Sequence, residues 1–463
     1  MSYPAVTPLP PVITSPIPWL RAGYDLLEDA TSFLAAQREL WGDTFVVDAL
    51  GYRLFFVFDA KGVAALYAAE EDRASFGLAT YELVFRRKIP QALVLGRRNR
   101  PHDLFKNPEV ETYLENLERA VELEIAALGQ RGVFECFGLA KRLGYRLGLA
   151  SWAGVEAASP ERLPRLIEAF DRLDTADSFV RPHSLLWSQL TGKLSERRAM
   201  RAIERTLGEI LDARRASGER RGDFLERIEE SFADVPLPER NIQVVRDVML
   251  IQMGAQSNLP AAFAWTLANL LLNPPLLEAV RDGDDALIER CASESIRWAQ
   301  RSLTLRRVLR PFEIETEKGR YTLAPGVLLA TMLSVTNRSA APGLEPFDPG
   351  NYSGRKLVEP VAKTLPAREL VSTFGHGRHS CPAQRFSISA IRIAVRRLVD
   401  RFELEPQFRI ARPRARQLGG VARCDNPCNV DYRVRGLPRH ISYAEAPIAA
   451  LSEPARAQPA TRP

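Results

Sequence analysis

The chain has 463 residues, of which 46% are hydrophobic, so it can bury a large core and would ordinarily divide into two or three domains. Its net charge of +6 is a small basic surplus spread along the chain, which argues against dedicated nucleic-acid binding. Five cysteines at irregular spacing form no disulfide framework and fit a reducing cytoplasm. Cys424 and Cys428 have no second ligand pair nearby, so no metal site is expected there.

The two ends of the chain differ from its body. Residues 1–18 are rich in Pro, and residues 445–463 are rich in Ala and Pro without apolar periodicity. We expect both segments to run over the surface or to be disordered. Because residues 1–18 contain no apolar run, neither a signal peptide nor a membrane anchor is expected there.

The body of the chain predicts strands, then a long helical region, then strands again. Residues 44–59 contain two apolar runs about a glycine and predict a β-hairpin. Helical patterns dominate from about residue 108 to 273, and strand-like runs return at residues 302–315, 319–330 and 429–435.

One uncharged segment, residues 248–272, is long enough to cross a bilayer. It also contains Gln252, Gln256 and Asn269, and each of these amides is costly in lipid unless it is paired. We therefore predict that this segment is a central helix buried inside a large protein.

Glu294 and Arg297 stand three residues apart, which places their carboxylate and guanidinium on one face of a helix. Such a pair is by default a surface ion pair that contributes little stability. Residues 345–352, rich in Pro and aromatic side chains, follow about fifty residues later along the chain.

Cys381 follows a turn rich in glycine. Gly375 and Gly377 allow the backbone to turn tightly beside a flat ligand, Pro382 fits the first turn of a helix, and residues 384–405 carry apolar side chains at helical spacing. Cys381 would then lie at a helix N-terminus, where a thiolate is stabilised. Taken alone, the pattern fits an ordinary buried thiol equally well.

The wider spacing resembles the haem-binding loop of the cytochrome P-450 superfamily. Phe374 stands seven residues before the cysteine, Gly377 four before and His379 two before, whereas the family's Gly two residues after the cysteine is Ala383 here. The resemblance implies haem b, with Cys381 as the iron ligand and Phe374, Gly375, Gly377 and His379 around the cofactor. Such a thiolate favours O–O bond cleavage.

The same resemblance implies the fold and the role of the paired charges. It predicts a mainly α protein with small β-sheets (α+β), in which residues 19–444 form one helix-rich domain that encloses the haem. Glu294 and Arg297 would be structural and bond to the loop before the haem ligand, and residues 345–352 would dock on that pair. Arg306 matches a position that pairs with a haem propionate, a charge-assisted contact that His379 would also make.

The third propionate partner stays open among four residues: His102, Arg97, Arg98 and Arg100. An apolar substrate cavity is expected from side chains in three segments of the chain, namely Phe76, Phe85, Leu104, Phe105, Phe179, Leu186, Trp187 and Leu303.

The distal helix of the family is expected to begin near Pro238, with Ala255 against the haem. Ser257 and Asn258 occupy the positions where the family has an acid followed by Thr, which deliver protons. General acid help of this kind is worth roughly 10²–10⁴-fold in rate, but an amide does not supply a proton at neutral pH. Asn258 would instead order a water or bind a substrate oxygen, or it would only satisfy a backbone kink beside Pro260.

Residues 256–260 resemble the branch of the family that contains cholesterol 7α-hydroxylase, sterol 12α-hydroxylase and prostacyclin synthase. Two enzyme functions follow: a monooxygenase acting on a sterol, terpenoid, fatty acid or natural-product intermediate, or an electron-independent isomerase or dehydratase of a peroxide-type substrate. A third alternative is a haem protein that binds a ligand or acts as a sensor without turnover.

A monooxygenase would need a redox partner. A ferredoxin or flavodoxin would dock on a basic face of the helix after Cys381, formed by Arg392, Arg396, Arg397 and Arg401; a solvated helix face is the alternative. A cytoplasmic, monomeric, bacterial enzyme is expected.

Overall fold

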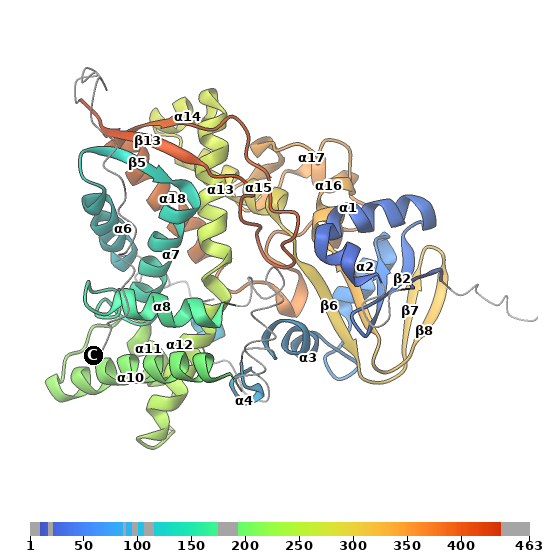
Figure 1. Ribbon diagram of the computed structural model, residues 1–463, viewed down its shortest axis with the longest axis horizontal. Coiled ribbons are helices and arrows are strands. Elements are labelled where there is room, and N and C mark those ends of the chain that lie inside the picture. Colours follow the sequence, from blue (N-terminus) through green and yellow to red (C-terminus); the bar gives the residue numbers. More distant parts are fainter. Residues whose placement is uncertain are drawn as a thin grey trace, which may run out of the picture.

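The computed structural model describes residues 10–16, 22–86, 89–94, 101–105, 115–174 and 193–436. The predicted C-terminal tail and six of the residues considered above lie outside these ranges: Arg97, Arg98, Arg100, Phe179, Leu186 and Trp187. Figure 1 shows two parts side by side, a helical body and a smaller part built on a β-sheet. The expected combination of many helices with small sheets is confirmed.

The larger sheet has six strands, and its order mixes segments that are distant in sequence. Parallel pairs join β1 to β2 and β3 to β9, and the other neighbours are antiparallel. The order is β1 (Val12–Ile13), β2 (Thr44–Ala49), β3 (Tyr52–Val57), β9 (Leu328–Met332), β6 (Leu303–Val308) and β4 (Ala74–Ser75). The sheet therefore places strand β9, from the second half of the chain, beside the N-terminal hairpin, and β6 between β9 and β4.

The N-terminal hairpin forms where it was predicted, and its turn has a clear physical cause. Leu50 (φ 55°) and Gly51 (φ 79°) both have positive φ, the geometry that suits two-residue hairpin turns. Phe45 and Val47 pack on one face of the sheet, while Val46 packs on the other. Helix α1 (Gly23–Trp41) covers the first face and α2 (Ala60–Ala68) the second, so both faces of this hairpin are buried.

Part of the Pro-rich N-terminal segment is ordered in the sheet. Val12 pairs with Val46, and Ile13 pairs with Val47, in parallel register. Val12 is exposed. Within the described residues 10–16, residues 12–13 form an edge strand, because their backbone groups bond to the free side of β2.

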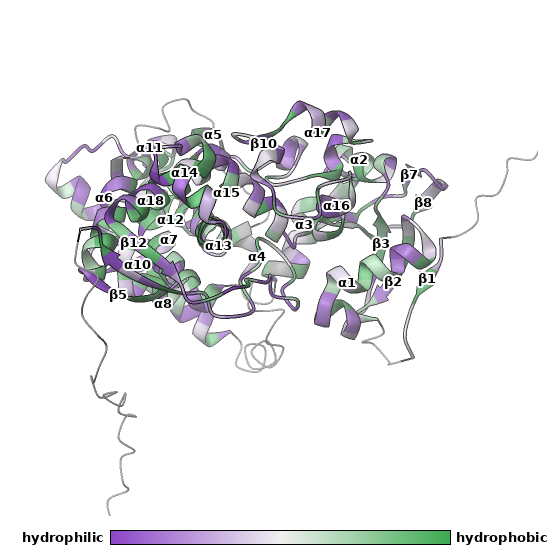
Figure 2. Ribbon diagram, turned by 90° about the horizontal axis from the view of Figure 1, so that it is seen from above, coloured by the Kyte–Doolittle hydropathy of each residue, from purple (hydrophilic) through white to green (hydrophobic). Residues whose placement is uncertain are grey.

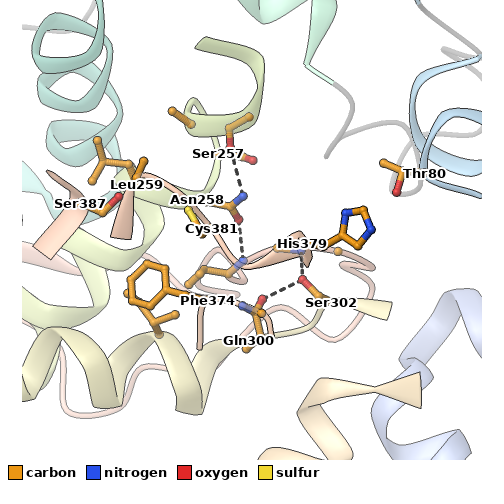
Figure 3. Close-up of a pocket in the computed structure, with 18 of the residues that line it drawn as sticks. Thr80, Ser257, Asn258, Leu259, Gln300, Ser302, Phe374, His379, Cys381 and Ser387 are labelled. Carbon is orange, nitrogen blue, oxygen red and sulfur yellow. Dashed lines mark hydrogen bonds between the residues drawn. The ribbon is translucent and has the colours of Figure 1, made fainter. Parts of the chain in front are cut away.

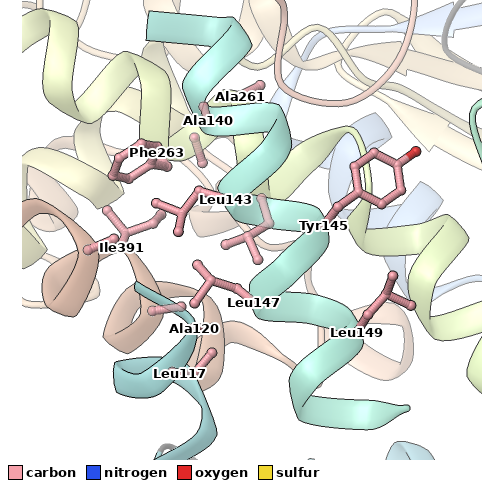
Figure 4. Close-up of a cluster of buried hydrophobic side chains, with 14 of the residues drawn as sticks. Leu117, Ala120, Ala140, Leu143, Tyr145, Leu147, Leu149, Ala261, Phe263 and Ile391 are labelled. Atoms are coloured by element: carbon pink, nitrogen blue, oxygen red, sulfur yellow. The ribbon is translucent and has the colours of Figure 1, made fainter. Parts of the chain in front are cut away.

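The helical body contains the largest core. Its helices are α6 (Glu115–Leu128), α7 (Cys136–Trp152), α8 (Leu163–Leu173), α10 (Leu194–Ser217), α11 (Phe224–Ser231), α12 (Glu239–Ala255), α13 (Asn258–Leu272), α14 (Pro274–Arg281), α15 (Asp285–Ala299) and α18 (Gln384–Arg401). Figure 4 shows α7 in the middle of this core, with Leu143 and Leu147 beside Phe263 of α13 and Ile391 of α18.

Helices α7 and α13 approach each other closely because Gly144 has no side chain. A Cβ built on Gly144 would lie 2.6 Å from Cγ of Pro260, closer than atoms can pack. Pro260, near the start of α13, is therefore held against the middle of α7.

The uncharged segment forms two helices rather than one. Helix α12 ends at Ala255 and α13 starts at Asn258, with Gln256 and Ser257 between them. Pro260 falls at the third position of α13, where a helix has no partner for the missing N–H. Among the described residues, no helix has the length and apolar character needed to span a membrane.

Helix α18 is shorter than its apolar pattern predicts, since it ends at Arg401. Phe402 and Leu404 are buried and alternate with less buried residues, which is the two-residue period of a strand. They belong to β12 (Phe402–Pro406), which pairs with β13 (Asn429–Val434), and β13 pairs in turn with β5 (Arg131–Glu135). Strand β5 was not predicted within the helical region.

Two two-stranded sheets complete the fold: β7 (Phe312–Thr316) with β8 (Gly319–Leu323), and β10 (Tyr352–Ser353) with β11 (Lys356–Leu357). The strands predicted in residues 302–330 and 429–435 are confirmed. Figure 2 shows hydrophilic residues on the outer helices; α17 (Glu359–Thr364), for example, buries none of its residues.

Candidate active site

A cavity of about 600 Å³ lies where the helical body meets the sheet. Its lining includes four stretches of the chain: the α12–α13 junction, the N-terminal part of β6, the turn before α18 and residues 418–421. Four of the predicted substrate-contact residues, Phe76, Phe85, Phe105 and Leu303, also line it, whereas Leu104 does not.

Cys381 lies in the wall of this cavity, at the end of a tight turn (Figure 3). Its backbone N–H donates to the carbonyl of Phe374 at 2.7 Å, which closes the turn. Gly375 has φ 77°, and a Cβ there would lie 3.0 Å from the carbonyl oxygen of His379, so only glycine fits without strain. Gly377 also has positive φ. The turn holds the sulfur in place just before α18.

The electrostatics at the sulfur favour the neutral thiol when no cation is bound. Burial raises the pKa of Cys381, and the backbone N–H of Ala383 lowers it by a smaller amount. The opposing N–H is the contribution expected from a helix start. A bound metal cation would reverse the balance, because a coordinating thiol loses its proton outright.

Arg306 and His379 share a carboxylate at the edge of the cavity. Oε1 of Glu71 lies 2.7 Å from Nε2 of His379 and 3.4 Å from Nη1 of Arg306. Burial opposes ionisation of Glu71, but hydrogen bonds from Ser75 and from the N–H of Phe76 outweigh it and lower the pKa of Glu71. The two basic residues predicted to hold carboxylates therefore already bind one.

Arg306 retains one unused donor. Its guanidinium is 2% exposed, and its Nη atoms donate to the carbonyls of Ala74 and Tyr67. Its buried Nε has no hydrogen-bond partner among the described residues. An unpaired buried donor is costly, and a ligand carboxylate would satisfy it. The cavity, the sulfur in its wall and this donor set together fit a cofactor that carries carboxylates, such as the haem that the sequence pattern implies.

Glu294 and Arg297 form a fully buried ion pair on α15. Nη2 of Arg297 lies 2.6 Å from Oε1 of Glu294, and Nε lies 2.7 Å from Oε2. Arg297 also donates to the carbonyls of Asn337, Leu344 and Pro346. The geometry is therefore that of a buried anchor, unlike a surface pair.

The pair reaches two segments by different routes. Oε1 of Glu294 accepts from the N–H of Asp348 at 2.9 Å and from the amide of Asn351 at 3.2 Å, so residues 345–352 contact it directly. The turn before Cys381 is reached through Asn337, which accepts from the N–H of Ser372 and donates to its carbonyl. This indirect link differs from the direct bond that was predicted.

Across the cavity, the α12–α13 junction carries Ala255, Ser257 and Asn258, all of which line it. Both ends of the Asn258 amide are engaged. Nδ2 donates to the carbonyl of Gly254 at 3.2 Å, one turn earlier, and Oδ1 accepts from the N–H of Val421 at 3.0 Å. Asn258 thus bridges the helix break to a distant loop.

That loop is the tip of a hairpin, residues 412–425, which we call the C-terminal hairpin. Gly419 and Gly420 have positive φ, and a Cβ on Gly420 would lie 2.3 Å from Oδ1 of Asn258. The tip bonds to residues 299–302 through the backbone of Arg301 and the hydroxyl of Ser302. Sequence reasoning did not assign this contribution to the cavity, and the Gly419-Gly420 pair was its only local signal.

The predicted basic face after Cys381 is largely neutralised. Three of its arginines have a carboxylate oxygen close to a guanidinium nitrogen: Glu289 lies 3.2 Å from Arg392, Asp285 lies 2.6 Å from Arg396 and Glu122 lies 3.4 Å from Arg397. Each arginine also contacts a second carboxylate, namely Asp285 for Arg392, Asp400 for Arg396 and Glu118 for Arg397. Carboxylates from α6 and α15 face α18 and cancel most of this positive charge. At these three residues the ion pairs favour the alternative of a solvated helix face over a basic docking face.

Curated proteins that match the chain over most of its length point to one family. Human 24-hydroxycholesterol 7-alpha-hydroxylase is 21% identical over 92% of this chain and 94% of its own. Lanosterol 14-alpha demethylase of Bos taurus is 20% identical over 83% of this chain and 80% of its own. Human prostacyclin synthase is 28% identical over 68% of this chain and 65% of its own. The chain is an enzyme of the cytochrome P-450 type.

Membership of the cytochromes P-450 accounts for the main features of the site. Relatives of this kind imply a haem-thiolate cofactor, hydrophobic substrates and redox partners in general. No family model matches the chain. The relatives named above are eukaryotic, so the expectation of a bacterial origin has no support from them.

Proposed function

We propose that this cytochrome P-450 is a monooxygenase that inserts one oxygen atom from dioxygen into a hydrophobic small molecule of sterol or related lipid type. The observation that carries the proposal is a sulfur, Cys381, in the wall of a mostly apolar cavity, opposite a helix break that offers Ser257 and Asn258. The relatives that match over most of the chain include a 24-hydroxycholesterol hydroxylase and a lanosterol demethylase, which supports the substrate class.

We assign haem b as the cofactor, bound by Cys381 with Phe374, Gly375, Gly377 and Ala255 against it. Haem held by a thiolate supplies activation of dioxygen with a bias toward O–O cleavage. Arg306 and His379 would bind the propionates, which would either replace the Glu71 carboxylate or bind beside it. Glu294 and Arg297 act structurally, since they lie outside the cavity lining.

On the distal side, the described residues that line the cavity include no carboxylic acid, so we propose that other groups handle protons there. The amide of Asn258 bonds to Gly254 through its nitrogen and to Val421 through its oxygen, and it thereby fixes the position of this part of the cavity wall. The hydroxyl of Ser257, which lines the cavity beside it, can donate and accept at once and would hold a water at the wall. Apolar side chains such as Phe76 and Leu303 would exclude bulk water and bind the lipid.

The decisive experiment on the cofactor uses Cys381→Ser. We expect the wild-type protein, reduced under carbon monoxide, to show the strongly red-shifted Soret band of thiolate-ligated haem, and the variant to lose it. Cys428→Ser, whose sulfur lies outside the cavity lining, is the matched control and should keep the band. A wild-type protein without the band, or a Cys381 variant that retains it, would contradict the proposal.

A second function, electron-independent isomerisation or dehydration of a peroxide-type lipid, is favoured by the likeness to prostacyclin synthase. The two functions separate when candidate lipids are supplied anaerobically, with and without reductant. A monooxygenase gives product only with dioxygen and electrons. Product formed from a lipid peroxide in their absence would replace the first function with the second.

We further propose that residues 19–444 are one cytochrome P-450 domain and that the enzyme acts as a cytoplasmic monomer. Electrons would come from a ferredoxin or flavodoxin at the Cys381 side. Because Arg392, Arg396 and Arg397 are paired with carboxylates, the exposed Arg378 in the turn and Arg385 at the start of α18 are the better candidates for contact. Reversing the charge of Arg385 should slow reduction by the partner and leave the carbon monoxide band unchanged.

A further inference from the structure

The base of the C-terminal hairpin brings two thiols together. The N–H of Asp425 donates to the carbonyl of Arg412, and the N–H of Arg414 donates to the carbonyl of Arg423, both at 2.8 Å. Pro413 pairs with Cys424 in this short ladder. Cys428 follows four residues after Cys424, immediately before β13.

The two sulfurs are in contact and shielded. Sγ of Cys428 lies 3.6 Å from Sγ of Cys424, and the two residues are 0% and 7% exposed. Asn426 sits between them in sequence and accepts from both, through Oδ1 from Cys424 and through its carbonyl from Cys428. A disulfide needs an S–S distance of about 2.05 Å, so a shift of roughly 1.5 Å closes the bond.

The surroundings of the two sulfurs favour Cys424 as the nucleophile. The hydrogen bond from Cys428 lowers the pKa of Cys424, and backbone N–H groups of the loop add to this effect. A thiol whose pKa lies nearer neutrality is the better attacking group. Cys136, whose N–H donates to the carbonyl of Cys428, behaves differently: burial raises its pKa, which makes it unreactive.

We propose that Cys424 and Cys428 form a reversible disulfide when the protein meets hydrogen peroxide. The Cys424 thiolate attacks one peroxide oxygen, the O–O bond breaks, and a sulfenic acid and water form once a proton is taken up. Cys428 then attacks the Cys424 sulfur, the S–O bond breaks, and the second water leaves as the S–S bond forms. Two electrons pass from the sulfurs to the peroxide, and a dithiol reductant restores both thiols.

The location gives the bond a consequence for the cavity. Leu418, Gly419, Gly420 and Val421 at the hairpin tip line the cavity, and Val421 bonds to Asn258. Closing the disulfide ties the strand that leaves the tip to the start of β13. The oxidised hairpin therefore holds the cavity wall more rigidly than the reduced hairpin.

The test is peptide mapping of the full-length holoprotein after brief exposure to a few equivalents of hydrogen peroxide. Trypsin cleaves after Arg423 and Arg433, so both cysteines fall in one peptide. We expect that peptide to become lighter by two hydrogens, to resist alkylation at both sulfurs, and to recover both sites after dithiothreitol. Independent alkylation of the two thiols, a bond to Cys136, or oxidation beyond the sulfenic acid without a bond would overturn the proposal.

A second measurement tests the link to the cavity. Hydrogen–deuterium exchange across residues 412–425 should slow in the oxidised wild type and stay unchanged by peroxide in Cys428→Ser and Cys424→Ser. Each variant's thermal midpoint checks that it is folded. Equal exchange in the oxidised and reduced wild type would sink the claim about the hairpin, while the carbon monoxide band reports separately on Cys381.

Discussion

At the scale of single residues, the contact between Asn258 and Val421 gives the distal amide a measurable role. Asn258→Thr can return a hydrogen bond to the carbonyl of Gly254, but its shorter side chain leaves the N–H of Val421 unpaired. We expect a loss of about 1 to 2 kcal/mol in the free energy of unfolding and fewer product molecules per electron consumed, measured by urea denaturation and by coupling assays.

Gly420→Ala is the matched control for this change. Its new Cβ would collide with the same amide oxygen, at 2.3 Å, and its φ of 65° is unfavourable for Ala. It therefore displaces the hairpin tip while keeping the amide. If both variants lower coupling alike, Asn258 acts by holding the tip. Unchanged rate and coupling in Asn258→Thr would mean that the residue has no part in handling oxygen.

Local spacing made some residues of the site predictable and left others hidden. Cys381 and its glycines are neighbours in sequence, and Glu294 and Arg297 share one helix, so their arrangement follows from short-range geometry. Glu71, by contrast, meets Arg306 only because β6 lies beside β4 in the sheet. No pattern within either segment announces a contact between residues so distant in the chain.

At the scale of elements, the crossing of α7 and α13 predicts a sharp response to added volume. Gly144→Ala should destabilise the protein by about 1 to 3 kcal/mol, because its Cβ would overlap Pro260. Gly208→Ala, on the open side of α10 with no atom within 4 Å, should instead stabilise by about 0.5 to 1 kcal/mol. Thermal unfolding measures both, and equal effects would refute the close crossing.

The end of α10 is tied to its neighbours by buried charges, which predicts a dependence on pH. Arg214 is 8% exposed and contacts Glu156 and Asp223, each at 2.7 Å. Burial opposes ionisation of Glu156, yet its hydrogen bond with Arg214 prevails and lowers its pKa below 4.5. Its contribution to stability is therefore present above pH 4.5 and is lost as the pH falls through the lowered value.

Glu156→Gln should accordingly cost about 1.5 to 3 kcal/mol at pH 7, and the difference from wild type should shrink in acid below pH 4.5. The measurement is the thermal midpoint as a function of pH. Glu168→Gln, which removes an exposed pair with Arg172 on α8, is the control and should change little at any pH. A deficit for Glu156→Gln that persists unchanged in acid would contradict the ion-pair account.

Element boundaries depended on tertiary contacts more than element types did. The strong periodicities at residues 44–59 and 384–401 predicted a hairpin and a helix correctly. The end of α18, however, is set by pairing of Phe402 with Val434, and β5 exists because β13 lies beside it. Both depend on β13, which lies hundreds of residues from β5 in the chain, so a local sequence pattern does not predict them.

At the scale of the whole molecule, Arg297 joins the helical body to the turn that carries Cys381. Its guanidinium binds three carbonyls in residues 337–346, and Asn337 passes the connection to Ser372. Arg297→Met leaves Glu294 buried without its partner, at a cost of about 3 to 5 kcal/mol. We expect a lower unfolding midpoint and a lower haem content after gel filtration.

Arg290→Met provides the comparison on the same helix. Arg290 pairs with Asp284, and both side chains are about one-third exposed or more, so its loss should cost little. Normal stability and haem content in Arg297→Met would show that the buried network does not support the cysteine turn.

The paired arginines of α18 have a consequence for kinetics. Long-range electrostatic attraction accelerates the encounter of two proteins and weakens steeply with salt. On this enzyme the carboxylates of Asp285, Glu289 and Glu122 neutralise most of the positive charge of these arginines. An electron donor arriving at this side would depend on short-range contacts such as those with Arg378 and Arg385, so the rate of electron delivery should depend only weakly on ionic strength.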